Sequence, residues 1–206
     1  MKPARVRPDF SRERARIADG ALLVAGVDEV GRGPLAGPVA VAAIILDPAH
    51  VPEGLDDSKA LSEARRESLS KVILESALGV SLALASAAEI DAFNIRGATL
   101  RAMRRALAAL APRPDFALID GRDAPDGLIC PAQSLIGGDG RSQSIAAASI
   151  VAKVLRDQLM READRHWPGY GFAVHKGYPT AAHRAAIGRL GLSPLHRRSF
   201  RSGGGA

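Results

Sequence analysis

Short apolar runs bounded by glycine, proline or polar residues predict buried strands at five places along the chain. The first two runs flank a glycine-rich turn, and the third alternates apolar with small residues at the two-residue period of a strand. The fourth run ends at Asp120, directly before a glycine. The strands are expected at residues 22–27, 39–46, 80–84, 116–119 and 128–130.

Apolar residues three or four positions apart predict helices between and after these strands. Ser62, Ser86, Asn94 and Thr180 are suited to cap the N-termini of four of them. The expected helices are one with Leu69, Val72 and Ile73 on one face, one after Ser86, one after Asn94 that Pro112 ends, a long one over about 145–165, and a last one closed by Gly191.

Early strands followed by strands alternating with helices indicate an α/β fold with a mixed central sheet flanked by helices. The chain has 206 residues, of which 47% are hydrophobic, and this is enough for one sizeable core. We therefore expect a single domain over residues 21–200. Residues 1–20 are expected to form a flexible leader and residues 201–206 a disordered tail, because both lack packing potential.

The basic charge is concentrated towards the C-terminus. Residues 1–140 carry 17 Lys+Arg and 19 Asp+Glu, a net charge of −2, whereas residues 141–206 carry 11 and 3, a net charge of +8. Such asymmetry favours a polyanionic partner such as nucleic acid through counterion release. A basic surface that is merely solvated is the alternative, so charge alone does not decide.

The cysteine content and the hydropathy pattern indicate the compartment. Cys130 is the only cysteine, which excludes an internal disulfide and a cysteine-based zinc site and fits a reducing cytoplasm. The basic N-terminus has no apolar stretch suited to a signal peptide, and no later segment is apolar over the length of a membrane span. We expect a soluble cytoplasmic protein without membrane contact.

Asp28 and Glu29 stand where the first apolar run gives way to a glycine-rich turn that contains Arg32. Carboxylates can hold a divalent metal, and an arginine can bind phosphate. Successive side chains of a regular strand point to opposite faces, so the two carboxylates can share one site only if the strand ends or bulges between them. A solvated or turn-capping role is the competing interpretation.

Two further carboxylates follow predicted structure that could bring them near this pair. Asp120 ends an apolar strand, and ligand crevices in α/β sheets form at the carboxyl ends of strands; a structural Asx turn is the alternative. Asp139 lies in the glycine-rich loop 137–140, just before the long predicted helix. Clustered carboxylates repel one another unless cations neutralise them, and Mg²⁺ prefers oxygen ligands. The four residues together point to metal-assisted cleavage of a phosphodiester.

The pattern Gly31-x-Gly33-x-x-Ala36 formally matches a dinucleotide-binding fingerprint. Such a fingerprint opens a helix, whereas Pro34 and Pro38 lead into another predicted strand. The two preceding carboxylates would also repel a pyrophosphate. A dinucleotide cofactor is therefore not expected.

Further polar residues could contact a nucleic acid. Lys59 lies in a loop, Ser149, Lys153 and Arg156 share the long predicted helix, and Tyr178 lies among basic residues. A cation can hold a phosphate while an aromatic ring stacks on a sugar or base. Solvated charges and an ordinary loop tyrosine are the alternatives.

Five segments of the chain together resemble bacterial ribonuclease HII, the type 2 ribonuclease H family. The resemblance spans nearly everything between residues 22 and 200. The segments are residues 26–38, 57–59, 118–121, 146–157 and 175–180. The resemblance implies a ribonuclease H-like fold with a mixed central β-sheet flanked by helices and a helical C-terminal part that helps grip the duplex.

The resemblance also implies an activity and a set of catalytic residues. Members of the family cut the RNA strand of RNA/DNA hybrids and nick duplex DNA 5′ of embedded ribonucleotides, using Mg²⁺ or Mn²⁺ and leaving 3′-hydroxyl and 5′-phosphate ends. Two-metal-ion hydrolysis is the expected mechanism. By this resemblance the four catalytic carboxylates look like Asp28, Glu29, Asp120 and Asp139, of which the first three would bind metal directly.

The substrate contacts are carried over in the same way. The segment Gly31, Arg32 and Gly33 resembles the backbone that recognises the ribose 2′-hydroxyl, the group that distinguishes RNA from DNA. Tyr178 resembles the ring that stacks at the RNA-to-DNA junction. The further expected substrate-binding residues are Lys59, Ser149 and Lys153. We expect a monomer that acts in DNA replication and ribonucleotide excision repair, and the sequence identifies no replication partner.

Departures from the family pattern are few. Many relatives have a lysine where this chain has Gly137 and an asparagine where it has Arg122. Type 3 relatives usually show Gly-Lys-Gly and an extra N-terminal domain, so Arg32 and the short leader favour type 2. Two other functions remain open: a related metal nuclease without a ribose requirement, such as a junction resolvase, and a basic nucleic-acid-binding module whose carboxylates are only structural.

Overall fold

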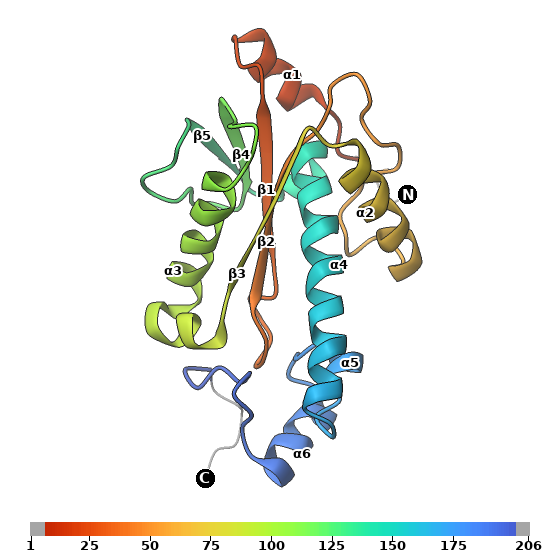
Figure 1. Cartoon of the computed structure of the whole chain (residues 1–206), viewed down its shortest axis with the longest axis vertical. Coiled ribbons are helices and arrows are strands. Elements are labelled where there is room, and N and C mark those ends of the chain that lie inside the picture. Colours follow the sequence, from red (N-terminus) through yellow and green to blue (C-terminus); the bar gives the residue numbers. More distant parts are fainter. Residues whose placement is uncertain (1–6, 201–206) are drawn as a thin grey trace, which may run out of the picture.

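A mixed five-stranded sheet runs through the centre of the computed structural model, which describes residues 7–200 (Figure 1). Its strands are β1 (Val24–Val30), β2 (Val39–Ile45), β3 (Gly79–Ala85), β4 (Phe116–Asp120) and β5 (Ala132–Leu135). The first three form an antiparallel meander, whereas β4 and β5 run parallel to β1, in the spatial order β3-β2-β1-β4-β5. The predicted α/β fold with a mixed sheet is confirmed.

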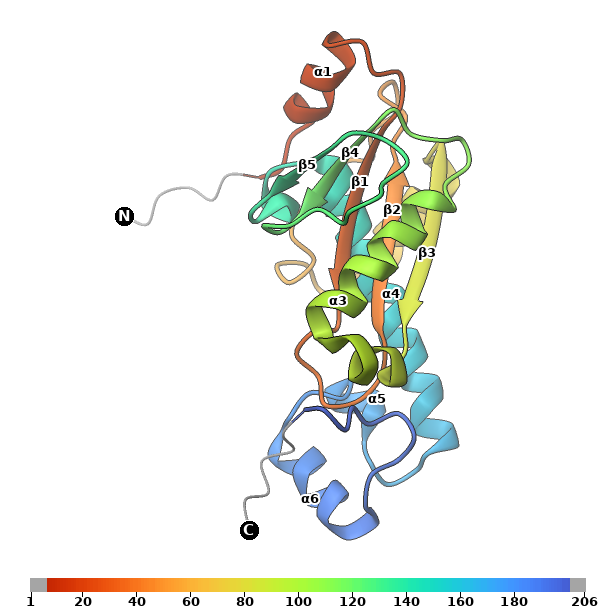
Figure 2. The same ribbon diagram turned by 90° about the vertical axis from the view of Figure 1, so that its left-hand side faces the viewer.

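Helices cover both faces of this sheet. One face packs against α3 and the other against α2 and α4, while α5 and α6 lie beyond one end of the sheet and α1 lies at the opposite end (Figures 1 and 2). The helices are α1 (Ser11–Ala18), α2 (Glu63–Ser76), α3 (Ala87–Ala108), α4 (Gln143–His166), α5 (Phe172–His175) and α6 (Ala181–Leu190), with a 3₁₀ turn η1 (Gly138–Gly140). Within residues 7–200, no helix is long and apolar enough to cross a membrane.

Alternating side chains on β1 divide the core into two layers. Ala25 and Val27 belong to the apolar cluster that includes α3, whereas Gly26 between them faces α4. A Cβ on Gly26 would lie 2.1 Å from the backbone carbon of Ser144. The long helix α4 therefore rests directly on the backbone of β1, a contact that only glycine permits.

Helix caps form where the sequence predicts them. The side chains of Ser62, Ser86 and Thr180 each accept a hydrogen bond from the backbone N–H three residues further on. Asn94 adopts a φ of 55° inside α3, and its side chain accepts a hydrogen bond from the N–H of Gly97 at 3.0 Å. Asn94 thus divides α3 into two helical pieces, as the predicted cap requires.

Two predicted boundaries are wrong. Residues 128–130 form no strand, and β5 instead follows them, where it pairs with β4. β5 is an edge strand with Gln133 exposed and Ser134 partly buried, so it lacks the apolar run that marks a buried strand. The helix expected to reach Pro112 ends at Ala108, before the proline.

The flexible leader expected over residues 1–20 is wrong for the described part of that segment. Residues 11–18 form α1, Phe10 is buried, and Glu13 is fully buried. Glu13 Oε1 accepts hydrogen bonds from Ser142 Oγ at 2.6 Å and from the N–H of Ser144 at 2.8 Å, which ties α1 to the start of α4. Residues 1–6 and the predicted tail over 201–206 lie outside the described residues.

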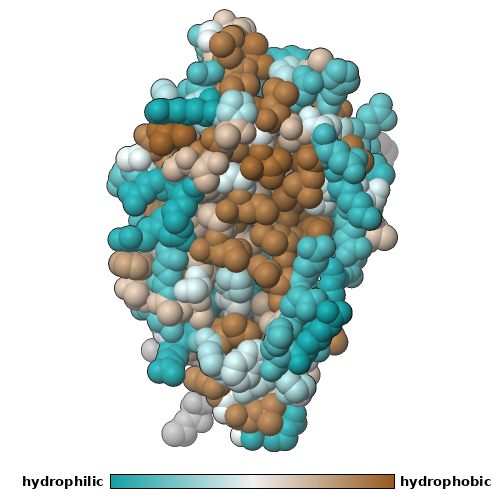
Figure 3. Space-filling model, viewed as in Figure 1, coloured by the Kyte–Doolittle hydropathy of each residue, from teal (hydrophilic) through white to brown (hydrophobic). Residues whose placement is uncertain are grey.

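An apolar patch lies on the side of the molecule that carries β3. Leu82 and Leu84 on β3 and Leu74 on α2 are exposed. Figure 3 shows a broad brown area on the face of the molecule that Figure 1 presents. β3 is the edge strand farthest from β4 and β5. The patch is therefore separate from the predicted site at Asp28 and Asp120.

We expect Glu13→Ala to destabilise the fold, because it leaves the Ser142 hydroxyl and the Ser144 N–H without their buried acceptor. The free energy of unfolding should fall by about 1–3 kcal/mol in urea denaturation. Glu13→Gln retains an acceptor oxygen, so its free energy of unfolding should fall less. Glu75→Ala, at an exposed position, should leave the free energy of unfolding almost unchanged. Wild-type stability of Glu13→Ala would contradict this role.

Candidate active site

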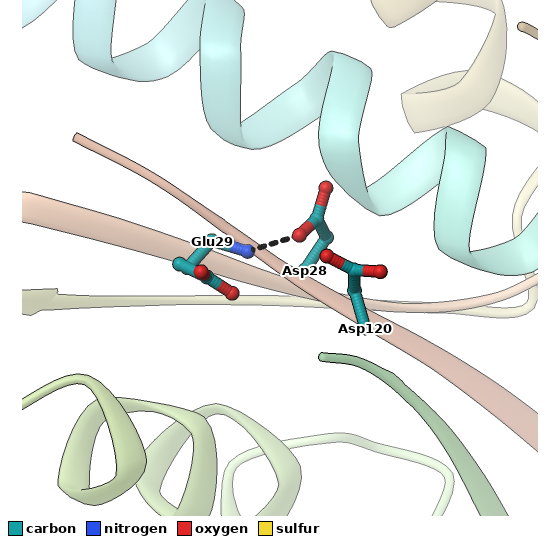
Figure 4. A group of neighbouring side chains, drawn as sticks. All are labelled: Asp28, Glu29 and Asp120. Carbon is teal, nitrogen blue, oxygen red and sulfur yellow. Dashed lines mark hydrogen bonds between the residues drawn. The ribbon is translucent and has the colours of Figure 1, made fainter. Parts of the chain in front are cut away.

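Three carboxylates converge where β1 leaves the side of β4 (Figure 4). Asp28, Glu29 and Asp120 each offer an oxygen, and these oxygens lie within 4.8 Å of one another. Figure 4 shows Asp28 directed towards α4, Glu29 on the other side of β1, and Asp120 extending from β4 towards the pair. The structure thus brings together three of the four predicted carboxylates.

The expectation that β1 ends or bulges between Asp28 and Glu29 is wrong. β1 stays in register with β2 through both residues. On its other side, the last residue of β4 is Asp120, and the final β1–β4 pair is Val27 with Ile119. Beyond that pair no strand of residues 7–200 lies along this edge of β1. Side chains from both faces can therefore reach around the open edge to a common point.

Backbone amides orient two of the carboxylates. Asp28 Oδ1 accepts a hydrogen bond from the N–H of Glu29 at 2.7 Å, and Asp120 Oδ1 accepts one from the N–H of Gly138 at 2.6 Å. A Cβ on Gly138 would lie 2.6 Å from a methyl carbon of Ile145, so a side chain there would push the amide away from Asp120. These bonds fix the carboxylates before any ligand arrives.

Burial raises the pKa of all three carboxyl groups. It raises the pKa of Glu29 to about 7, against the effect of Arg32, whose guanidinium lies 3.4 Å from Glu29 Oε1. Burial, followed by the charges of Glu29 and Asp120, raises the pKa of Asp28 well above its ordinary value. Burial likewise raises the pKa of Asp120. A cation at the common point would relieve this repulsion, and an all-oxygen donor set suits a hard divalent cation.

Asp139 and Lys59 lie at the rim of the cluster. Asp139 is on η1 and largely buried, and its Oδ2 lies 3.6 Å from Nζ of the exposed Lys59. Burial lowers the pKa of Lys59, but Asp139 and the neighbouring carboxylates outweigh this effect and raise it overall. The fourth predicted carboxylate is therefore near the other three, with a cation of the chain already beside it.

Ser149 and Lys153 both lie on α4 but have different surroundings. Ser149 is buried, and its hydroxyl lies 2.9 Å from that of Ser58. Burial raises the pKa of Asp28, and the nearby Ser149 side chain acts in the opposite direction. The structure thus places Ser149 beside Asp28, without an exposed surface for substrate. Lys153 Nζ donates to Asp157 Oδ1 at 2.7 Å, so its charge is paired on its own helix.

Two buried arginines, Arg156 and Arg197, hold the glycine-rich turn. The sequence indicated Arg156 as a possible nucleic-acid contact or a solvated charge, and it did not indicate Arg197. Arg156 on α4 is fully buried, so its interpretation as a solvated charge is wrong. It lies seven residues after Ser149, two turns along the same face of α4, and this spacing was the available signal. The carbonyl acceptors are Ala36, Pro38 and Lys176 for Arg156, and Gly31, Arg32 and Gly37 for Arg197.

These bonds determine which way the peptide groups of the turn face. In a trans peptide the C=O and the following N–H point in opposite directions. Because Arg197 binds the carbonyls of Gly31 and Arg32, the N–H groups of Arg32 and Gly33 point away from it, and both residues are exposed. Gly31 has a φ of 99°, and a Cβ there would lie 2.1 Å from Nε of Arg156.

The ring of Tyr178 lies beside this turn. A Cβ built on Gly33 would meet Tyr178 Cε1 at 3.7 Å, and Tyr178 is 42% exposed. The N–H of Leu35 donates to the carbonyl of Gly177 at 2.8 Å, which joins the turn to the segment that carries the ring. An exposed ring next to exposed amides suits contact with a sugar or base.

A hollow beside the carboxylates has basic side chains on its wall. Glu29 and Asp120 line it together with Arg32, Arg96 and Arg122. The sequence alone does not distinguish Arg96, because it is one of several arginines on a predicted helix. Arg96 lies 2.9 Å from Asp123, which also lines the hollow, and Arg32 lies 3.4 Å from Glu29, so these two charges are already paired within the chain. Arg122 adds a further basic side chain next to the cluster, where a phosphate could bind.

Comparison with known proteins agrees with the sequence resemblance. The family model of ribonuclease HII matches residues 25–202. The chain is 57% identical over 196 residues to ribonuclease HII of Ruegeria pomeroyi, covering 95% of this chain and 83% of that protein. It is 60% identical over 195 residues to ribonuclease HII of Mesorhizobium japonicum, covering 94% and 84%.

The chain belongs to the ribonuclease HII family. It is a ribonuclease H, a hydrolase that acts on RNA/DNA hybrids, so the predicted family and enzyme class are confirmed. The ribonuclease H2 of Pyrococcus horikoshii superposes with a TM-score of 0.76 at 25% identity, covering 88% of this chain and 95% of that one. Bst ribonuclease HIII in complex with Mn²⁺ shares the fold with a TM-score of 0.70 at 23% identity, covering 89% and 68%.

We expect Asp28→Asn to stabilise the ribonuclease HII fold in the absence of metal, because it removes one charge from a buried cluster of like charges. Carboxyl pKa values raised in the folded state make the folded protein bind more protons than the unfolded one, so stability falls as pH rises. For Glu29 this loss of stability takes place between about pH 4.5 and about pH 7.

The measurement is thermal denaturation in chelator at pH 5 and pH 8. The free energy of unfolding of Asp28→Asn at pH 8 should exceed that of wild type by about 1 kcal/mol or more. Its stability should also fall less than that of wild type between pH 5 and pH 8. Asp19→Asn, at an exposed carboxylate paired with Arg16, is the matched control and should not change the slope. Lower stability of Asp28→Asn than of wild type at pH 8 would contradict the proposed repulsion.

Proposed function

We propose that this ribonuclease, besides cutting the RNA strand of hybrids, nicks duplex DNA 5′ of embedded ribonucleotides and leaves 3′-hydroxyl and 5′-phosphate ends. The observation that supports this is the position of three converging carboxylates next to a turn in which Arg32 and Gly33 are exposed and their N–H groups point away from Arg197. Hydrolysis and recognition of the ribose 2′-hydroxyl would then take place side by side.

Asp28, Glu29 and Asp120 would hold the divalent cations, Mg²⁺ or Mn²⁺, and their raised pKa values and all-oxygen donor set fit such ions. When bound, a pair of these cations supplies an activated water for attack on phosphorus and stabilises the leaving 3′-oxygen. The manganese complex of a ribonuclease HIII with the same fold supports the choice of ion class.

The chain's own residues would position the scissile phosphate and move protons. The amide bonds to Asp28 and Asp120 keep these carboxylates aimed at the common point, so little reorganisation is needed on binding. Asp139 would act as the fourth catalytic carboxylate by accepting a proton at Oδ2, the oxygen nearer Lys59. Lys59, exposed beside it, would neutralise a phosphate of the substrate.

The turn and the ring would select the substrate. The N–H groups of Arg32 and Gly33 would donate to the ribose 2′-hydroxyl or the adjoining phosphate, and Tyr178 would stack at the junction between RNA and DNA. Lys153 would reach the phosphate backbone by leaving its ion pair with Asp157. The net charge of +8 over residues 141–206 supports a grip on the duplex by the C-terminal part.

The proposal extends to the working form of the enzyme. We place it in DNA replication and ribonucleotide excision repair in the cytoplasm, acting as a monomer. Residues 9–200 would act as one catalytic unit, because α4 contacts α1, the sheet and the C-terminal segment. Partners other than the nucleic acid are not part of the proposal.

Asp120→Asn should abolish cleavage while leaving duplex binding intact, because it removes a cation ligand without touching the basic surface. We expect a fall of more than about a hundredfold in the cleavage rate of an RNA/DNA hybrid with Mg²⁺. Asp126→Asn, an exposed carboxylate in the following loop, is the control. Cleavage by Asp120→Asn at the wild-type rate would refute the metal assignment.

The substrate for the same assay separates the competing functions. A duplex with one ribonucleotide should be nicked and an all-DNA duplex should not, in each case with and without chelator. Equal cleavage of both would favour a metal nuclease without a ribose requirement. Binding without hydrolysis, even with Mn²⁺, would favour a nucleic-acid-binding module.

Gly33→Ala should weaken recognition of the ribose without disturbing the fold. The φ of Gly33 lies outside the left-handed region, and the nearest atom to an added methyl is Tyr178 Cε1 at 3.7 Å, an ordinary contact. The methyl would occupy the exposed side of the turn, so kcat/KM on the single-ribonucleotide duplex should fall about tenfold or more.

Gly31→Ala is the contrasting variant, because its methyl would clash with Arg156 and its φ of 99° disfavours alanine. It should lower the melting temperature, whereas Gly33→Ala should not. Unchanged kcat/KM for Gly33→Ala would argue against this face of the turn as the ribose contact.

A further inference from the structure

Three histidines form a cluster in the C-terminal part, away from the carboxylates: two are hydrogen-bonded to each other, and the third stacks on one of them. His183 on α6 and His196 are buried, and their Nε2 atoms lie 3.1 Å apart. His175 on α5 stacks on His183 with 4.3 Å between ring centroids, and Phe172 packs edge-on against the ring of His183. None of these histidines takes part in the hydrolysis proposed above.

The partners of the two buried histidines fix where each proton lies. The backbone N–H of Ser193 donates to His196 Nδ1 at 2.9 Å, so Nδ1 carries no proton and Nε2 does. His196 Nε2 then donates to His183 Nε2, which leaves the His183 proton on Nδ1. That N–H donates to the backbone carbonyl of Tyr178 at 2.9 Å. The relay runs in one direction, from Ser193 to Tyr178.

The same reasoning assigns the third histidine. The N–H of Gly177 donates to His175 Nδ1 at 3.1 Å, so His175 Nε2 carries the proton and donates to the carbonyl of Tyr170 at 2.8 Å. Gly177 and Tyr178 are thus both held by histidines from different sides. All three rings have their donors and acceptors satisfied in the neutral state.

We propose that His183 and His196 are positioning residues that hold the Tyr178 ring at the substrate turn. At the end of the relay, His183 Nδ1–H donates to the carbonyl of Tyr178. The neighbouring carbonyl of Gly177 accepts a hydrogen bond from the N–H of Leu35 in the glycine-rich turn. These bonds set the ring beside Gly33 before substrate binds. The inference rests on the proposed role of Tyr178 as a substrate contact.

The surroundings keep the relay neutral. Burial lowers the pKa of His183, and burial followed by the neighbouring His183 ring lowers the pKa of His196 to about 4. His175 from α5 and the Arg184 guanidinium from α6 also oppose protonation of His183. Met160 of α4 belongs to an apolar cluster with Tyr170 and Phe172, whose rings pack against His196 and His183. An added proton would set two N–H groups against each other and break the relay.

The first test needs no variant and no substrate. Nitrogen-15 NMR of the histidine rings in the wild-type protein should show His183 protonated at Nδ1 and His196 protonated at Nε2 at neutral pH. The Nδ1–H form is the less common one in free histidine, so its presence at His183 is diagnostic. His183 protonated at Nε2, or charged at neutral pH, would overturn the relay.

The second test uses a matched pair of variants. His183→Asn places an amide N–H near the position of Nδ1 and can still donate to Tyr178, whereas His183→Gln places it near Nε2 and cannot. Both variants remove the ring from the cluster. We expect His183→Gln to raise KM about fivefold with kcat within about twofold of wild type, and His183→Asn to keep KM close to wild type.

Both variants are assayed on an RNA/DNA hybrid and on a duplex with one ribonucleotide. Equal losses in the two variants would mean that the histidine only packs, and no loss in either would mean that the relay does not act on Tyr178; either result overturns the proposal. Cleavage of the hybrid alone by the wild-type protein would refute the nicking activity instead, while the variant pair still tests the relay on the hybrid.

Discussion

The direct contact between β1 and α4 at Gly26 determines where the side chains of the site lie. The two elements run in the same direction, with Gly26 against Ile145 and Gly31 against Arg156. The five residues from Gly26 to Gly31 of the extended chain advance about 17 Å, and the eleven residues from Ile145 to Arg156 of the helix advance about the same distance. The two contacts are therefore equally far apart along the extended chain and along the helix. One helix can therefore bring a hydroxyl, Ser149, to the carboxylates and a guanidinium to the turn.

The sequence predicted the components of the site better than their geometry. Apolar runs and glycines located β1, β2 and the turn, and Asp120 ends β4 as expected. Asp28 and Glu29 instead lie inside β1, which continues past the expected end at residue 27 to Val30. The open edge of β1 depends on where β4 ends, which is a property of pairing between distant segments, so the local pattern suggested a bulge at Glu29 instead. The structural roles of Arg156 and Glu13 were missed for the same reason, because their partners lie far along the chain.

Carboxylates and guanidinium groups are buried in adjoining parts of the site, and the two kinds of group are neutralised or hydrogen-bonded by different partners. Burial raises the pKa of Asp28 and Glu29, and burial followed by the charge of Arg156 lowers the pKa of Arg197 to about 9. The guanidiniums are satisfied by carbonyl oxygens of the chain itself, so the turn is rigid in the protein alone. The carboxylates lack such internal partners in sufficient number, and this leaves them dependent on cations from outside.

The end of β4 at Asp120 makes some changes of chain length far more harmful than others. Side chains alternate along a strand, so one residue added inside β4 would turn Asp120 to the opposite face of the sheet and remove it from the cluster. A residue added within 122–130 would only lengthen a largely exposed loop, at a small cost in conformational entropy. Asp120 thus separates a loop whose length can change at little cost from a strand whose length fixes the site.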